Sequence, residues 1–186
     1  MEHTINEQIL EKVKRFRLPE YETIPDVGLY LEQVVQYIND CFKQVPGMEI
    51  TGSMISNYVK QGVVGKSIKK RYYREHIVRL IFSVVAKSVL SLDNIGLLFV
   101  MHAEVYPDYI AYEYLREEML NVGEYVFGLK DDLPEIGVTH SDAKTLLRKT
   151  IIAFMHKIYV DMHLELEREK RESAKYVVHP KSWTKN

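Results

Sequence analysis

The chain has 186 residues, of which 46% are hydrophobic and 27% are charged, and its formal net charge at pH 7 is −1. Such a composition is typical of a globular protein and excludes a largely disordered chain. The single cysteine, Cys41, excludes an intramolecular disulfide and a multi-thiolate zinc site, and we expect it to be a buried, inert thiol. The N-terminus is polar and no apolar run reaches the length of a membrane span, so the sequence predicts a cytoplasmic protein without membrane contact.

Helical periodicity begins near the N-terminus. Residues 4–16 predict a short amphipathic helix, which the Leu-Pro pair that follows brings to an end. Residues 26–42, capped by Asp26, predict a longer helix that is buried along much of its length. A shorter helix is expected over residues 50–62, with Thr51 as its N-cap.

The stretch after this third helix predicts a β-hairpin. Gly62 suits the left-handed position just past a helix C-terminus. Two short runs of apolar and aromatic residues, 63–64 and 71–73, then bracket the polar loop 65–70. This pattern predicts a short two-stranded wing beside the helix.

The second half of the chain is also predicted to be helical, so the expected fold class is mainly α. Residues 74–90 carry the clearest apolar stripe, and Ser91 is positioned to cap the next helix. A polar, proline-containing linker and then a long helix with a highly charged, solvent-exposed end follow. The expected elements are helices over 74–90, 92–102, 107–128 and 142–174, with the linker at 131–139.

Basic residues are concentrated in one short segment. Residues 50–74 contain six basic and no acidic side chains, so the rest of the chain holds 19 basic and 26 acidic residues. A compact basic segment on an acidic body is the charge pattern of a local nucleic-acid contact. On charge alone, a solvated basic loop is the alternative interpretation.

The helix predicted over residues 51–61 has two faces of different chemistry. Ile55, Tyr58 and Val59 share the apolar one. The opposite face carries two hydroxyls, an amide and an ammonium group, from Ser53, Ser56, Asn57 and Lys60. Because Asn pairs with adenine edges, and Ser and Lys bind bases or phosphates, this face suits the major groove of DNA.

The stretch ITGSMISNYVKQGVV resembles the recognition-helix region of MerR-type regulators, with Thr51, Ile55, Tyr58 and the Gly-Val-Val ending at the family's intervals. The following KKRYYREHIVRLIF resembles the family's wing and next helix, and VLSLDNI resembles the segment after it. The resemblance implies a winged helix-turn-helix whose recognition helix is residues 51–61 and whose basic wing is residues 65–74. The wing residues implied to contact DNA are Lys66, Lys69, Lys70, Arg71 and Tyr73.

Over residues 18–110 the chain is similar to a family of uncharacterised bacterial proteins built around this MerR-like unit. The shared stretches are LPEYETIPDVGLYLEQVVQYIND and EITGSMISNYVKQGVV. The resemblance implies a bacterial, cytoplasmic setting and supplies no biochemical function. Two features depart from typical MerR proteins: the first helix is longer, and Ser53 and Ser56 stand where arginines are usual.

The expected organisation is a DNA-binding domain, a helical region and two terminal segments. The apolar spacing of the last helix suits either a homodimer seam or an ordinary intramolecular core. The tyrosine-rich stretch 106–114 can likewise line a ligand pocket or fill a core, and no effector is indicated. The assigned ranges are 1–17 for the N-terminal helix, 18–104 for the winged domain, 105–174 for the helical region with possible dimerisation, and 175–186 for a flexible tail.

No catalytic or metal-binding pattern accompanies these elements. His156 and His163 are a heptad apart, too far to chelate a metal together, and there is no phosphate-binding glycine loop or nucleophile elbow. We therefore expect no enzyme, no metal and no cofactor. The sequence predicts a transcriptional regulator that binds double-stranded DNA, and the alternative is a protein–protein interaction module with the same winged helical fold.

Overall fold

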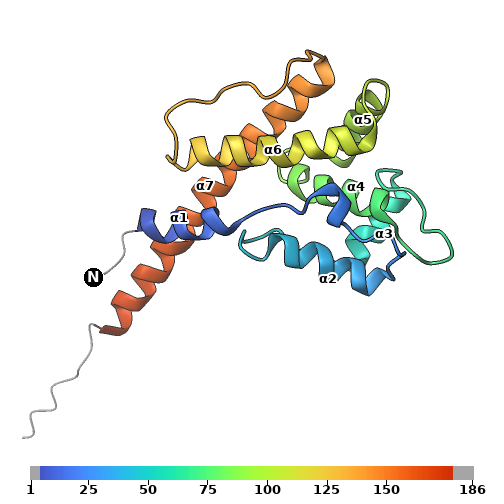
Figure 1. Ribbon diagram of the computed structural model, residues 1–186. Helices are drawn as coiled ribbons and strands as arrows, with labels where there is room; N and C mark the ends of the chain where they lie inside the picture. Colours follow the sequence, from blue (N-terminus) through green and yellow to red (C-terminus); the bar gives the residue numbers. More distant parts are fainter. Residues whose placement is uncertain (1–4, 178–186) are drawn as a thin grey trace, which may run out of the picture.

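Helices make up most of the protein. In this computed structural model, which describes residues 5–177, seven α-helices follow one another in the expected order, and the mainly α prediction is confirmed (Figure 1). A single turn of 3₁₀-helix, η1 (Tyr21–Thr23), precedes the second of them. The α-helices are α1 (Ile5–Arg15), α2 (Leu31–Phe42), α3 (Gly52–Lys60), α4 (Arg74–Ala86), α5 (Leu92–Ala103), α6 (Asp108–Val126) and α7 (Asp142–Val177).

The start of α2 differs from the prediction. The helix begins at Leu31 and not at residue 26, because Gly28 has a φ of +75° and cannot continue a helix. Asp26 does not cap α2. Its carboxylate instead accepts the backbone N–H of Arg74 at 3.2 Å. The N-terminus of α2 is closed by Gln33, whose side-chain oxygen accepts the backbone N–H of Tyr30 at 2.9 Å.

The predicted β-hairpin wing was wrong as a two-stranded element. Within the described residues no strand forms, and only two isolated bridges are present, Ile68 with Arg71 and Leu29 with Tyr72. The expected first strand, residues 63–64, closes the C-terminal end of α3, because both valine N–H groups donate to the carbonyl of Tyr58. Tyr72 pairs with Leu29 and not with the first half of the segment, so only the Ile68–Arg71 pair remains and the segment is a tight turn.

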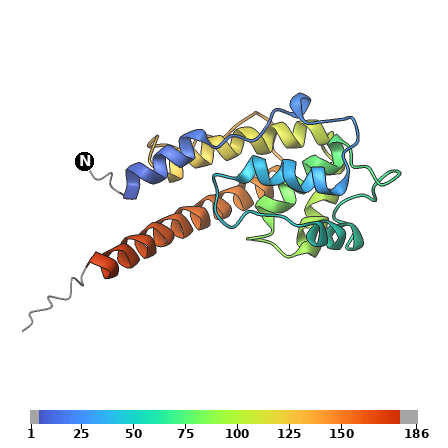
Figure 2. The same cartoon turned by 90° about the horizontal axis from the view of Figure 1, so that it is seen from below.

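The core is shared by both halves of the chain. Buried side chains from α2, α3 and α4 join those of α6 and α7 in one cluster. Figure 2 shows α1 and α6 running along the same side, with the end of α7 extending beyond the other helices. The apolar stripe of α7 packs inside the chain, which is the intramolecular alternative; its members are Leu147, Ile151, Phe154, Ile158, Met162 and Leu166.

Two smaller expectations concern the ends of the helices and the chain. The helix expected over 74–90 ends at Ala86, whereas Ser91 caps α5 as predicted, its hydroxyl accepting the N–H of Asn94. Of the expected flexible tail, residues 175–177 continue α7, and residues 178–186 lie outside the described residues. Across residues 5–177, no helix has the length and apolarity needed to cross a bilayer.

Candidate nucleic-acid interface

The orientation of α3 is fixed by its apolar face and by its first residues. Ile55 and Tyr58 are buried against the core, and the Thr51 hydroxyl accepts the N–H of Met54 at 3.3 Å, so the predicted N-cap is confirmed. The side chain of Asn39 in α2 accepts the N–H of Ile50 at 2.8 Å and donates to the Ile50 carbonyl at 3.1 Å. These bonds hold the segment that enters α3 against α2.

The polar face of α3 lies in solvent, as the sequence predicts. Ser53, Ser56, Asn57 and Lys60 are all exposed. The Ser53 hydroxyl is 2.8 Å from that of Thr51, and the Ser56 hydroxyl donates to the Gly52 carbonyl at 2.8 Å. Because a hydroxyl that donates can still accept, both serines remain able to bind a ligand. α3 therefore presents four polar groups along one exposed side.

A shallow, open groove runs beside this face. Ser53 and Asn57 form one wall, and Lys87, Leu90 and Ser91, from the turn between α4 and α5, form the other. The Lys87 ammonium donates to the carbonyl of Glu49 at 3.0 Å, and burial lowers the pKa of this lysine. The Ser91 hydroxyl, at the N-terminus of α5, therefore lies across the groove from the polar face of α3.

Residues 65–71, called the basic turn from here on, replace the predicted wing. Ile68 and Arg71 exchange two backbone hydrogen bonds of 2.9 Å, which close a two-residue loop. The two residues in the loop, Lys69 and Lys70, have φ values of 49° and 63°. Two successive left-handed residues are the pattern of a type I′ turn, which normally takes Asn-Gly or another combination of Asn, Asp and Gly.

The lysines of this region carry unneutralised charge. In the described part of the chain, four of them are exposed and form no ion pair: Lys60, Lys66, Lys69 and Lys70. Left-handed backbone costs an L-residue with a Cβ of the order of 1 kcal/mol, so Lys69 and Lys70 hold their positions at an energetic cost. The basic turn thus keeps two lysines at positions where Asn or Gly would make the folded protein more stable.

His76 attaches the basic turn to α4, a role that the sequence reasoning missed. Its Nδ1 accepts the backbone N–H of Tyr73 at 3.1 Å, so Nε2 carries the proton and donates to the Lys66 carbonyl at 3.1 Å. The imidazole is buried, with the edge of the Tyr72 ring against it. A polar side chain three residues after the N-cap, as in a capping box, is the local signal that would have identified it.

Two of the predicted wing residues have structural contacts. Arg71 donates to the Gly28 carbonyl and to the Tyr30 hydroxyl, both at 2.9 Å, and its guanidinium lies over the Tyr30 ring. Tyr73 packs against Gly28, where an added Cβ would lie 3.1 Å from the tyrosine ring. Only part of the Arg71 guanidinium therefore remains for a ligand, and the side chain of Arg74 is bound to residues 22–24.

The remaining features that the sequence singled out are the tyrosine-rich stretch, Cys41 and the potential metal ligands. In the tyrosine-rich stretch, Tyr112 is core, with its hydroxyl donating to the Pro19 carbonyl at 2.8 Å, whereas Tyr106 and Tyr114 line a cavity of about 250 Å³. Burial raises the pKa of the Cys41 thiol to about 11, so the thiol stays protonated at neutral pH. Among the described residues, no group of three or more potential metal ligands comes together.

Residues 19–115 match the family described as Domain of unknown function (DUF1836). The match spans more than half of the chain and includes α3 and the basic turn, so the chain belongs to this family. The expected relation to a family of uncharacterised proteins is confirmed, and the family description says nothing of a MerR-like unit. No curated protein and no solved structure matches the chain.

Proposed function

We propose that this DUF1836 protein is a transcriptional regulator that binds double-stranded DNA, with α3 in the major groove and the basic turn on the phosphate backbone. The arrangement would be a MerR-like variant of the helix-turn-helix in which a tight turn takes the place of a stranded wing. α2 and α3, joined through Asn39 and Ile50, would be the helix pair.

The observation that carries this proposal is the pair of lysines at left-handed positions in the basic turn. Lys69 and Lys70 occupy the two sites where Asn and Gly would relieve backbone strain. Their side chains are exposed and contribute nothing to the core, so the fold gains nothing that repays the strain. Strain held at an exposed, charged site is the mark of a functional constraint, and two adjacent ammonium groups suit a polyanion.

The polar face of α3 would read the bases. The Asn57 amide is exposed and matches the donor and acceptor pair of an adenine edge in the major groove. The hydroxyls of Ser53 and Ser56 would contact bases or phosphates, and Lys60 would meet phosphate. Because this face lacks arginine, most of the affinity would come from the basic turn.

Within the basic turn, Lys66, Lys69 and Lys70 would bind phosphates. Arg71 would act partly through its spare N–H groups and partly by fixing the turn to Gly28 and Tyr30. His76 would act as a positioning residue, since it bonds the Lys66 carbonyl without adding charge. One α3 offers few base contacts, so we expect two copies of the chain to occupy adjacent half-sites.

The proposal is tested by measuring binding of random and genomic duplex fragments by fluorescence anisotropy across a salt series. We expect selective binding that weakens as salt rises, because each neutralised phosphate contributes about −0.9 to the slope of log K against log salt. No binding at the lowest salt, or binding that is independent of salt, would refute the DNA proposal.

A double variant, Lys69→Asn with Lys70→Gly, separates charge from fold. It removes two positive charges while supplying the residues that a type I′ turn prefers. The slope should become shallower by about 1.8, and affinity at low salt should fall on the order of tenfold. The matched control, Lys149→Gln with Lys170→Gln, removes two exposed charges from α7 and should bind like the wild type.

The alternative function is a protein–protein interaction module, and α5 is the observation that favours it. Leu97 and Val100 on α5, and Val105 just beyond it, are each more than half exposed. A partner that docks on this apolar face would not depend on the charges of the basic turn. Pull-down of a specific partner by the wild type, lost in Leu97→Asp with Val100→Asp and retained in the turn variant, would favour this function.

A further inference from the structure

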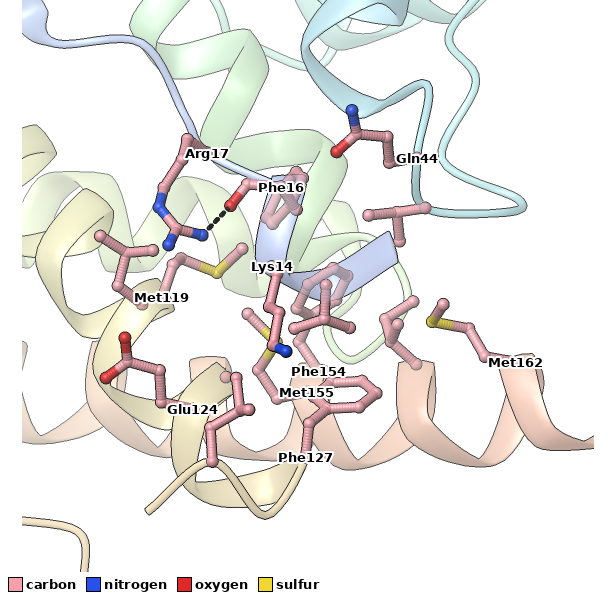
Figure 3. A pocket seen from close by; sticks show the side chains of 16 residues that line it. Lys14, Phe16, Arg17, Gln44, Met119, Glu124, Phe127, Phe154, Met155 and Met162 are labelled. Carbon is pink, nitrogen blue, oxygen red and sulfur yellow. Dashed lines mark hydrogen bonds between the residues drawn. The ribbon is translucent and has the colours of Figure 1, made fainter. Parts of the chain in front are cut away.

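A cavity of about 130 Å³ lies between α1, the segment just after α2, α6 and α7. Figure 3 shows phenylalanine and methionine side chains from α6 and α7 facing residues of α1 and of the segment after α2. These side chains are themselves buried, yet they leave the space unfilled. The apolar walls include Phe16, Met119, Phe127, Phe154, Met155 and Met162.

Four polar side chains line this cavity, Lys14, Arg17, Gln44 and Glu124, and the Glu124 carboxylate is 3.9 Å from the Lys130 ammonium. Lys14 and Arg17 lie at its mouth. The Lys14 side chain is more than half exposed, and its ammonium is 4.0 Å from the Glu11 carboxylate. Gln44 also lines the cavity, and its side-chain oxygen is buried without a hydrogen-bond partner among the described residues. A buried amide without a partner is costly, so this group calls for a polar atom from outside the chain.

We propose that this cavity binds a small aryl or alkyl carboxylate. Its volume approaches that of an apolar cavity of about 150 Å³ that holds benzene, so the hydrocarbon part would have about six to eight carbons. The carboxylate would sit at the mouth, where Lys14 and Arg17 supply positive charge and Lys130 offsets the charge of the Glu124 carboxylate. Because the Gln44 amide can present either its oxygen or its nitrogen, a half-turn of the amide would give the carboxylate a further N–H donor.

Two properties of the walls support this assignment. Met119, Met155 and Met162 are flexible and polarizable, and methionines of this kind adapt to ligands of different shape. Gly123 of α6 also faces the cavity, where an added Cβ would lie 3.6 Å from the terminal methyl of Met155. Since glycine weakens a helix interior, the missing side chain costs stability and leaves space.

The cavity also adjoins the part of the fold that leads to α3. Gln44 and Val45 belong to the segment between α2 and α3, which Asn39 holds at Ile50. An occupant would therefore rest against the support of α3. The ligand site itself does not depend on the proposed DNA binding, because its test reads occupancy directly.

The test uses three probes with the same phenyl group and different polar ends: phenylacetate, 2-phenylethanol and 2-phenylethylamine. Binding to the full chain is followed by the NMR signals of the methionine methyl groups. We expect phenylacetate to shift Met119, Met155 and Met162 and to leave Met54 and Met101 unmoved. Phenylacetate should bind on the order of tenfold more tightly than the alcohol, and the amine should be the weakest.

Two variants separate the apolar part of the site from its polar mouth. Gly123→Leu should abolish binding of all three probes, whereas Gly96→Leu, whose Cβ would meet open space on α5, should leave it unchanged. Lys14→Gln with Arg17→Gln should remove the preference for phenylacetate over the alcohol and retain binding of the alcohol. The proposal is overturned if millimolar phenylacetate leaves the three methyl signals unmoved, if the amine binds as well as the acid, or if Gly123→Leu binds like the wild type.

Discussion

The basic turn and the α6–α7 pair treat their charged side chains in opposite ways. Between α6 and α7, the Arg148 guanidinium lies 2.9 Å from the fully buried carboxylate of Glu118, and within α6 Arg116 lies 2.7 Å from Glu113. In the basic turn, Lys66, Lys69 and Lys70 face solvent and pair with no carboxylate in the described part of the chain. The first region uses charge to hold the fold together, whereas in the second only Arg71 is bound to the fold and the three lysines stay unpaired.

The two regions also differ in how well their residues suit the backbone conformation. The α6–α7 region consists of regular helices around a buried core, whereas the basic turn places two lysines at positive φ. A region selected for stability alone would have residues that suit its backbone. The basic turn thus differs from the α6–α7 pair both in unpaired charge and in residues that do not suit their backbone, and on this difference we base its proposed role as a DNA contact.

The largest expected effect is on the α6–α7 pair. Arg148→Met leaves the buried Glu118 carboxylate without its cation, with only the 3.3 Å bond from Asn121, and leaves the Leu133 carbonyl without the bond from Arg148. We expect a loss of about 3–5 kcal/mol in the free energy of unfolding, measured by urea denaturation. Arg171→Met, which breaks the exposed pair with Glu167, is the control and should change stability by less than about 1 kcal/mol. Equal effects of the two substitutions would contradict the distinction between buried and exposed pairs.

The next effect concerns the attachment of α3 to α2. Asn39→Ala leaves the N–H and the carbonyl of buried Ile50 without their side-chain partners. We expect a loss of about 2 kcal/mol in unfolding free energy and a weaker affinity for DNA, because α3 loses its fixed position. Asn39→Asp keeps the acceptor and loses the donor, so its unfolding free energy should fall between those of the wild type and of Asn39→Ala. An Asn39→Ala protein with wild-type stability would show that these bonds do not support α3.

The third effect depends on pH. Burial lowers the pKa of His102 below its ordinary value of 6.5, so the folded state binds fewer protons than the unfolded state as the solution becomes acidic. Stability is therefore complete above about pH 6.5 and falls below it, with a slope of at most about 1.4 kcal/mol per pH unit. His102→Leu should flatten the dependence between pH 7 and pH 5.5 in chemical denaturation. Parallel curves for wild type and variant would mean that His102 is not the group that titrates.

The smallest expected effect is a gain. Lys70→Gly relieves the Cβ strain at a φ of 63° and should raise the unfolding free energy by about 1 kcal/mol, while lowering DNA affinity. Lys43→Gly, which lies just past α2 in right-handed backbone, is the control and should not stabilise the protein. A Lys70→Gly protein that is less stable than the wild type would remove the argument from strain.

Local signals made most of the helices predictable. The cap residues Thr51 and Ser91 and the left-handed Gly62 act within a few residues of their own positions, so the sequence identified them directly. The polar face of α3 followed from spacing alone. The order of the helices was predictable for the same reason, since apolar periodicity is a local property.

The remaining features depend on contacts between distant residues. The pairing of Leu29 with Tyr72, and the bonds from Arg71 and Arg74 to residues 22–30, join segments about forty or more residues apart. These contacts explain why α2 starts late and why two cations of the expected wing are structural. The Glu118–Arg148 pair likewise joins two helices across the core. No periodicity in the sequence indicates such pairings.

Hydrogen exchange with and without duplex DNA, at low salt, tests most directly which region contacts a partner. If α3 and the basic turn form the interface, amides in residues 52–60 and 65–71 will be protected when DNA is present, and amides of α5 and of the exposed end of α7 will exchange as before. Protection confined to α5, or no change anywhere in the described chain under conditions where DNA is bound, would contradict the assignment of the basic turn and α3 as the functional surface.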